Sequence, residues 1–191
     1  MELVFATQNP NKAKEIEAKL GTGFSIIGLD TLGITEEIPE TAPNLEGNAL
    51  QKARYVYQKT KRNCFADDTG LEVEALNGEP GVLSARYAGL QKNAEDNMAL
   101  LLTNLKDKPN RSAQFRTVIA LIIDGEEHLF EGVAKGTIIE TKQGNEGFGY
   151  DPIFVPDGHT RTFAQMGLDE KNLLSHRAKA FDKMKEFLKT K

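Results

Sequence analysis

The stretch VFATQNPNKAKEI, from Val4 to Ile16, joins an apolar run directly to a helix-like pattern. The apolar run, Glu2–Ala6, predicts a buried strand, and Asn11–Leu20 has the periodicity of a helix. Asn9 is a good N-cap residue, and the proline after it suits the first helical position. The stretch therefore indicates the strand-then-helix arrangement of an α/β fold.

The rest of the chain continues this mixture of strand-like and helix-like segments. Helices are predicted over Glu46–Lys61, Ala94–Leu105 and Leu168–Lys189, with a break in the last near Leu174–Ser175. Strands are predicted over Phe24–Leu29, Asn63–Ala66, Leu71–Leu76, Ser112–Ile123 and Glu127–Ala134. Asp124-Gly125 predicts a hairpin turn between the last two strands. We expect a single domain over residues 1–191, with a strand-rich lobe around residues 112–141.

Composition limits the function classes open to the chain. A formal net charge of −4 argues against a nucleic-acid groove, which needs a concentrated basic face, although local charge can still bind an anionic ligand. The one cysteine, Cys64, excludes an intramolecular disulfide, and its apolar context favours a buried structural thiol. We see no signal peptide and no apolar run near the roughly 20 residues of a membrane helix. We expect a soluble, cytoplasmic protein with no nucleic-acid or membrane partner.

The residues from Thr7 to Lys12 predict a phosphate-binding turn. A helix N-terminus presents N–H groups and a partial positive charge, and Lys12 adds a full charge in the same turn, beside donors from Thr7 and Asn9. The GxxxxGK[ST] pattern of a Walker loop is absent. A capped helix with a solvated lysine is the alternative interpretation of the same residues.

Two adjacent acids in CFADDTG form a second candidate site. Asp67 and Asp68 would point to opposite sides of an extended chain, so only one is expected to face a given pocket. Mg²⁺ prefers one or two carboxylates together with water and phosphate oxygens. Asp68, beside Gly70 at an expected strand end, could ligate such an ion or activate water.

Two further acids precede this segment. Glu40 lies in an acidic loop expected over Ile34–Leu45, and Glu46 lies at the start of the next helix. For all of these acids, a solvated turn or a helix N-terminal charge is the alternative interpretation.

Two segments nearer the C-terminus carry side chains suited to a flat, polar ligand. In Gly147–Pro152 (GFGYDP), an aromatic ring between two glycines is well placed to stack on a ligand, although a tight turn with one anchoring aromatic also explains it. In Lys171–Arg177 (KNLLSHR), Ser175 can cap a helix whose first residues, His176 and Arg177, offer donors to a carbonyl or phosphate. A solvated helix start is the alternative there.

These segments occur in one order along the chain: TQNPNK, EGNALQKA, ADDTGL, PGVLSARYAG, GFGYDPIF and SHRAKA. With this order over nearly its whole length, the chain resembles the inosine/xanthosine triphosphate pyrophosphatase family, which acts on non-standard purine nucleotides. The resemblance implies an elongated, two-lobed α/β fold in which helices flank a long central mixed β-sheet, with the active site in the cleft between the lobes. It implies hydrolysis of ITP, dITP and XTP to the monophosphate and pyrophosphate with Mg²⁺, which Mn²⁺ could replace, and it implies a homodimer.

The resemblance also assigns roles to residues. It makes Asp68 the catalytic carboxylate and a metal ligand, with Glu40 as a second acid at the metal. The residues implied to bind substrate are Thr7, Gln8, Asn9, Pro10, Asn11 and Lys12 at the triphosphate, Thr69 in contact with the substrate, and Phe148, Gly149, Tyr150, Asp151, Lys171, His176 and Arg177 at the base. Two positions depart from the common pattern, because Asn11 stands where glycine is frequent and Thr69 where serine is frequent.

Base choice has a chemical logic in this scheme. The 6-oxo group of hypoxanthine or xanthine would accept from the Arg177 guanidinium, whereas the 6-amino group of adenine would leave a buried donor unpaired, at about 1–3 kcal/mol. Two other functions remain open: a related pyrophosphatase of the pyrimidine-specific or septum-associated kind, and a nucleotide-binding sensor without turnover. The SHR and GFGYDP segments favour the purine enzyme, and Asp68, Glu40 and Lys12 favour turnover.

Overall fold

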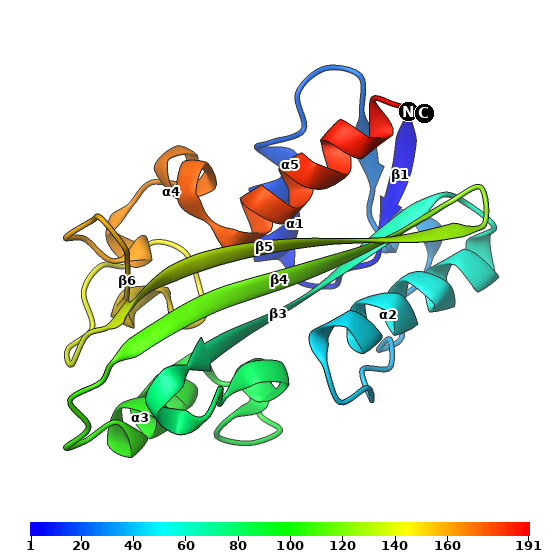
Figure 1. Cartoon of the computed structure of the whole chain (residues 1–191). Coiled ribbons are helices and arrows are strands. Elements are labelled where there is room, and N and C mark those ends of the chain that lie inside the picture. The colour runs from blue at the N-terminus through cyan, green and yellow to red at the C-terminus, as the bar shows by residue number, and fades with distance from the viewer. The chain divides into compact units, whose positions relative to one another are not determined.

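The computed structural model describes all residues, 1–191, and contains one six-stranded sheet in the order β2-β1-β3-β4-β5-β6 (Figure 1). The strands are β1 (Glu2–Phe5), β2 (Ser25–Ile27), β3 (Cys64–Val73), β4 (Ser112–Ile123), β5 (Glu126–Ile138) and β6 (Phe154–Pro156). The α-helices are α1 (Pro10–Glu17), α2 (Leu45–Thr60), α3 (Ala94–Asn104), α4 (Leu168–Leu174) and α5 (His176–Leu188). Strand β1 pairs in parallel with β2 and β3, whereas β5 pairs antiparallel with β6. The sheet is therefore mixed and flanked by helices, which confirms the predicted α/β class.

The chain forms two compact units. The first comprises Met1–Asp68, Thr117–Gly132 and Arg177–Lys191, and the second comprises Thr69–Arg116 and Val133–His176. Strands β3, β4 and β5 each contribute one part to each unit. Residues 112–141 thus belong to both units, and the expectation of a single domain with a strand-rich lobe stays a prediction.

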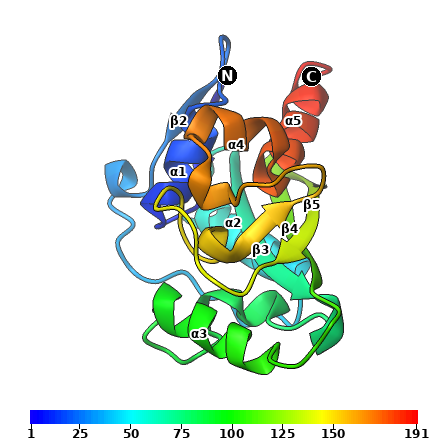
Figure 2. The same ribbon diagram turned by 90° about the vertical axis from the view of Figure 1, so that its left-hand side faces the viewer.

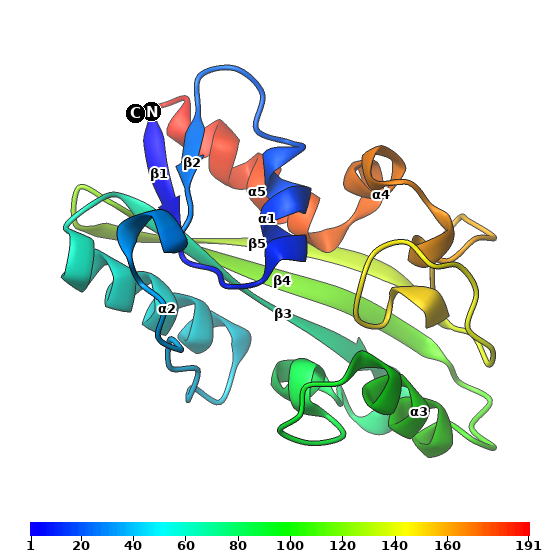
Figure 3. The same cartoon turned by 180° about the vertical axis from the view of Figure 1, so that it is seen from behind.

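The core of the first unit lies between β3 and α5. Phe5 of β1 stacks on Phe65 of β3 with ring centroids 4.4 Å apart, and the ring of Phe181 in α5 lies 6.2 Å from that of Phe65. All three rings are buried, and each contributes roughly 1.5–3 kcal/mol to folding. In this unit, α1 and α5 lie on one side of the strands and α2 on the other (Figures 1 and 3). The two acids that follow Phe65 in β3 therefore lie between these helices.

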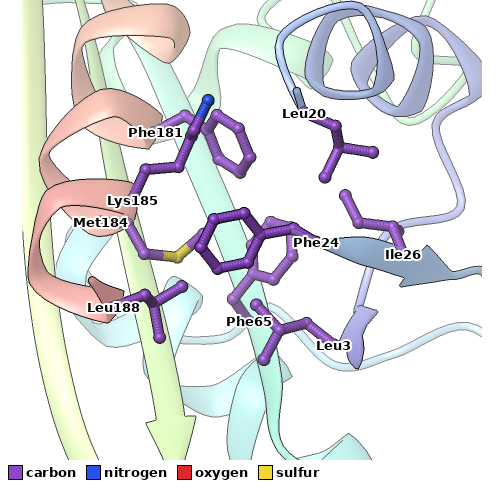
Figure 4. A pocket seen from close by; sticks show the side chains of 9 residues that line it. All are labelled: Leu3, Leu20, Phe24, Ile26, Phe65, Phe181, Met184, Lys185 and Leu188. Carbon is purple, nitrogen blue, oxygen red and sulfur yellow. The ribbon is translucent and has the colours of Figure 1, made fainter. Parts of the chain in front are cut away.

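A small apolar pocket adjoins this core (Figure 4). Its lining residues are Leu3, Leu20, Phe24, Ile26, Phe65, Phe181, Met184, Lys185 and Leu188. The one charged group among them, the Lys185 ammonium, donates to the backbone oxygen of Lys19 at 2.8 Å. The pocket is part of the packed interior and has the wrong chemistry for a phosphate.

The single thiol is buried between β3 and α2. Cys64 has no solvent exposure, and its Sγ donates to the backbone oxygen of Ala53 at 3.3 Å. Burial raises the pKa of the thiol to about 12. The prediction of a structural cysteine is confirmed.

The second unit has its own aromatic core. The ring of Phe115 in β4 lies 4.6 Å from that of Phe154 in β6, and Phe163 lies 5.2 Å from Phe154. Met98 and Leu101 of α3 are buried in the same cluster. Helices α3 and α4 lie on opposite sides of the strands of this unit (Figure 2).

One strand prediction is wrong in a way that matters for the site. The segments Asn63–Ala66 and Leu71–Leu76 were expected to be separate strands, with the acids at a strand end, but β3 runs unbroken from Cys64 to Val73. Aspartate and glycine favour turns locally, and tertiary pairing overrides that preference here. Glycine at position 70 instead lets the backbone of β3 pass close to that of Gly81, because a Cβ added to Gly70 would lie 2.5 Å from the carbonyl oxygen of Gly81.

Other local predictions are confirmed. Asp124 and Gly125, with φ of 52° and 84°, form the hairpin turn between β4 and β5, and Ser175 separates α4 from α5. Strand β5 extends to Ile138, four residues beyond the end predicted at Ala134. None of the helices combines the length and the apolar composition that a membrane crossing requires.

We predict that Gly125→Ala destabilises the protein by about 1–2 kcal/mol, because a Cβ is disfavoured in the left-handed conformation of this turn. Urea denaturation measures the change. Gly125→Asn is the matched control, and it should lose less because asparagine tolerates this conformation. Equal losses for both variants would show that the backbone conformation is not the cause.

Candidate functional site

The predicted phosphate turn is built by Asn9, the N-cap of α1. Its side-chain oxygen accepts from the backbone N–H groups of Asn11 at 3.0 Å and Lys12 at 3.4 Å. Pro10 has no N–H, and the N–H of Ala13 bonds the backbone oxygen of Asn9 at 3.2 Å. The cap therefore already satisfies most of the first-turn amides that were expected to hold phosphate. What remains for an anion is the positive helix end and the Lys12 ammonium.

Thr7 and Gln8 also make internal bonds. The Thr7 hydroxyl accepts from the backbone N–H of Asn9 at 3.1 Å. The Gln8 amide donates to the backbone oxygens of Thr35 at 3.3 Å and Glu36 at 2.7 Å. These side chains shape the turn and tie it to the acidic loop.

Lys12 lies at the edge of a buried ionic cluster around Asp67. The Lys12 ammonium lies 3.1 Å from Asp67 Oδ2, and Arg177 Nε donates to the same oxygen at 3.1 Å. The other side of the guanidinium pairs with Glu15 of α1. Asp67, Arg177 and Glu15 are each less than 5% exposed. Strand β3 and helices α1 and α5 thus share one charge network.

Electrostatics fix the protonation states in this cluster. Burial alone would raise the pKa of Asp67, but the charges of Lys12 and Arg177 outweigh it and hold that pKa below its usual range. Burial lowers the pKa of Lys12, and repulsion from Lys52 and Arg177 adds to the effect, against the attraction of Asp67. An added anionic ligand would relieve this repulsion between cations.

Asp68 belongs to a second cluster, formed with α2. Asn48 Nδ2 donates to Asp68 Oδ2 at 3.0 Å, and the Lys52 ammonium lies 3.8 Å from Asp68 Oδ1. Lys52 also pairs with Glu40. The prediction that the two adjacent acids face different partners is confirmed, since Asp67 contacts α1 and α5 whereas Asp68 contacts α2.

The two neighbouring acids have opposite pKa shifts. Burial raises the pKa of Asp68, the nearby Glu40 charge adds to this, and Lys52, Lys12 and Asn48 oppose it. Burial alone would lower the pKa of Lys52, but Asp68, Asp67 and Glu40 outweigh it and raise that pKa. The ammonium of Lys52 therefore stays charged between the two carboxylates.

The donor set around Lys52 fits a divalent cation. Glu40 and Asp68 already hold one positive group between them, and Mg²⁺ takes one or two carboxylates with water and phosphate completing its shell. No cluster of three or more histidine, cysteine or acidic side chains could hold a metal by itself. A cation held here would need ligands from water or from a phosphate.

Glu46, the other acid named from sequence, lies in the first turn of α2, where acidic residues are common at a helix N-terminus.

The residues assigned to the base lie mostly in the second unit. The Lys171 ammonium lies 2.6 Å from Asp151 Oδ2 and 4.9 Å from the centroid of the Phe148 ring. The backbone N–H of Phe148 donates to the same Asp151 oxygen at 3.0 Å. The structure thus brings together Phe148, Asp151 and Lys171 around one carboxylate.

The remaining predicted residues of this unit have supporting contacts. The Tyr150 hydroxyl donates to the backbone oxygen of Ser84 at 2.6 Å, and the His176 ring stacks on Phe115 at 4.6 Å. Gly149 has a φ of 62°, which suits glycine, and Thr69 is half-buried in β3 directly after Asp68. Arg177, although assigned to the base from sequence, lies in the first unit, against Asp67 and Glu15.

Three contributors were missed from the sequence: Asn48 and Lys52 of α2, in the cluster around Asp68, and Glu15 of α1, in the cluster around Asp67. Asn48 and Lys52 are four residues apart and lie on the same buried stripe as Ala49 and Ala53. A polar pair at helical spacing among small apolar residues was the available signal.

An α/β sheet that carries ammonium groups and carboxylates beside a helix N-terminus is typical of proteins that bind phosphorylated ligands. The chain belongs to the Ham1 family, whose model matches residues 3–187.

Relatives and solved structures agree over the full length. The chain is 58% identical to a dITP/XTP pyrophosphatase of Flavobacterium psychrophilum, over 99% of this chain and 100% of that one. It is 44% identical to the dITP/XTP pyrophosphatase of Bacillus subtilis, over 98% and 96%. The structure of the Staphylococcus aureus Ham1 protein superimposes with a TM-score of 0.89 at 38% identity, covering 100% and 99%. The family resemblance seen in the motifs is confirmed.

We predict that Asp67→Asn destabilises the protein by about 3–5 kcal/mol, because it leaves Lys12 and Arg177 without their shared counter-charge in a buried place. Thermal and urea denaturation measure the loss. Asp182→Asn is the control, since Asp182 pairs with Lys19 at 2.7 Å but is 53% exposed, and such a pair contributes less than about 1 kcal/mol. A loss for Asp67→Asn no larger than that of the control would contradict the buried-network interpretation.

Proposed function

We propose that the chain is a nucleoside-triphosphate pyrophosphatase that hydrolyses ITP, dITP and XTP to the monophosphate and pyrophosphate, and so cleanses the nucleotide pool. The observation that carries the proposal is the adjacency of two charged clusters in the first unit: Asp67 holds the Lys12 ammonium, and the next residue, Asp68, lies with Glu40 around the Lys52 ammonium. The names of its relatives support the same substrates. We place the enzyme in the cytoplasm, as its composition suggests, and propose that it is a homodimer, as the resemblance implies.

The two lysines neutralise the triphosphate. Burial lowers the pKa of Lys12, and repulsion between the charges of Lys12 and Lys52 adds to this. A polyanion placed between them would turn this repulsion into attraction. Preorganised charge of this kind is the main contribution that proteins make to phosphoryl chemistry.

The residues that fit a metal are Glu40 and Asp68. Mg²⁺, or Mn²⁺ in its place, would supply charge neutralisation at the phosphate oxygens there. The chain's own part is to hold the two carboxylates, through Lys52 and Asn48, where they orient a water molecule. The water oxygen attacks the α-phosphorus and gives its proton to a carboxylate of this pair, the bond from that phosphorus to the bridging oxygen breaks, and pyrophosphate leaves with the electron pair.

The base is recognised by a separate set of side chains. Phe148 stacks on the purine, with Gly149, Tyr150 and Asp151 beside it, and Lys171 and His176 supply donors, whereas the Arg177 guanidinium is engaged in its buried pairs with Asp67 and Glu15. The Asp151–Lys171 pair is 3% exposed at each side chain, so its polar groups are already fixed before a ligand binds. Rigid polar groups reject a base with the wrong donor pattern more strongly than mobile ones do.

Product identity tests the proposal. The purified protein with ITP and Mg²⁺ should release IMP and pyrophosphate; IDP and phosphate would overturn the assigned bond. A substrate panel with XTP, dTTP and a modified UTP separates the purine enzyme from its pyrimidine-specific or septum-associated relatives. Binding of ITP without any product would indicate a sensor.

We predict that Asp68→Asn lowers kcat for ITP by at least about 100-fold, the low end for loss of a general base. Steady-state assays of pyrophosphate release measure the effect. Asp182→Asn, which alters only an exposed pair, is the control and should retain activity. Turnover by Asp68→Asn near that of the control would refute the role of Asp68.

We predict that Phe148→Leu raises KM for ITP with little change in kcat, because stacking holds the ground state and the transition state alike. Base–aromatic stacking contributes about 1–3 kcal/mol, which corresponds to roughly a 5- to 150-fold rise in KM. The control is Phe24→Leu, in the apolar pocket of the first unit. An unchanged KM for Phe148→Leu would remove this residue from the base site.

A further inference from the structure

The loop that carries Glu40 has no regular structure of its own between the short turn Asp30–Leu32 and the start of α2. Side chains hold it in place instead. Gln51 Oε1 accepts from the backbone N–H of Thr41 at 2.8 Å, and the Tyr55 hydroxyl donates to the Glu36 carboxylate at 2.6 Å. Lys59 pairs with the same carboxylate, which lowers the pKa of Glu36 to about 2. One face of α2 therefore serves as the support for this loop.

Asn48 lies on that face of α2, and its side chain bonds both the loop and strand β3. Its side-chain oxygen accepts from the backbone N–H of Ala42 at 2.9 Å, two residues after Glu40. Its side-chain nitrogen donates to Asp68 Oδ2 at 3.0 Å. The residue is 2% exposed, so neither bond competes with water. A single planar amide thus joins the acid-bearing loop to the acid-bearing strand.

The chemistry of the amide makes this bridge directional. A backbone N–H can be met only by the amide oxygen, and a carboxylate only by the amide nitrogen, so the side chain has one orientation that satisfies both partners. Reversing it would leave two buried groups unpaired, at about 1–3 kcal/mol each. The position of the loop and the rotation of the Asp68 carboxylate are therefore set together.

We propose that Asn48 is a positioning residue that holds Glu40 and Asp68 in register as one cation-binding pair. The inference rests on the proposed function, because it concerns the acids assigned to catalysis there. Asn48 acts through these acids, because both polar groups of its side chain are bonded to the chain itself. Its loss leaves both carboxylates present but no longer aligned with each other.

The test compares Asn48→Leu with Gln51→Leu. Both variants cut a hydrogen bond between α2 and the same loop, but only Asn48→Leu also releases Asp68. Direct binding of Mn²⁺ to the free protein, followed by water proton relaxation, should weaken about 10- to 100-fold in Asn48→Leu, the usual effect of removing a partner of a metal ligand. Gln51→Leu should bind Mn²⁺ within about twofold of the wild type. Hydrogen exchange of residues 34–44 should increase in both.

The outcomes separate this inference from the proposed function. Equal Mn²⁺ affinity in Asn48→Leu and wild type would overturn the role of Asn48, and so would an equal loss in Gln51→Leu, which would show that loop order alone matters. Asn48→Ser, smaller and still polar, replaces Asn48→Leu if that variant does not fold, with the same expected loss. Failure of the wild type to convert ITP to IMP would instead overturn the proposed function.

Discussion

The carboxylate of Asp67, shared between Lys12 and Arg177, is the interaction on which the charged centre of the first unit depends. It lies on a central strand, whereas its two partners come from helices at opposite ends of the chain. Buried cations without a counter-charge would each cost several kcal/mol. One strand carboxylate therefore allows α1 and α5 to bring positive charge to the same place, where a phosphorylated ligand would encounter it.

Asp68, the next residue along β3, has a pKa shift opposite to that of Asp67. Asp67 is held ionised by cations, whereas Asp68 has its pKa raised by burial and by Glu40. The alternation of side chains along a strand separates the two environments by a single peptide unit. The structural carboxylate of Asp67 and the carboxylate assigned to chemistry, Asp68, can then be adjacent in sequence without interfering. Helix α2 supplies Lys52 and Asn48, which contact Asp68.

Local signals predicted local structure well. The cap at Asn9, the turn at Asp124-Gly125 and the break at Ser175 depend on residues within a few positions, and each lies where the sequence indicated. The division of β3 was wrong because Asp67–Gly70 has turn chemistry, and only pairing with distant strands keeps it extended. Lys52 and Asn48 were missed for a related reason, since nothing in α2 alone reveals that Asp68 lies against it. The order of the motifs still identified the right family, because members of one family share both these motifs and the fold in which they lie.

The burial of Cys64 has a practical consequence. With its sulfur enclosed by β3 and α2 and its pKa near 12, the native chain offers almost no thiolate to an alkylating reagent at neutral pH. A cysteine introduced at any exposed position would thus be the one group that a maleimide dye modifies. The folded protein is in effect a cysteine-free background, ready for single-site fluorescent or spin labels without prior removal of its own sulfhydryl.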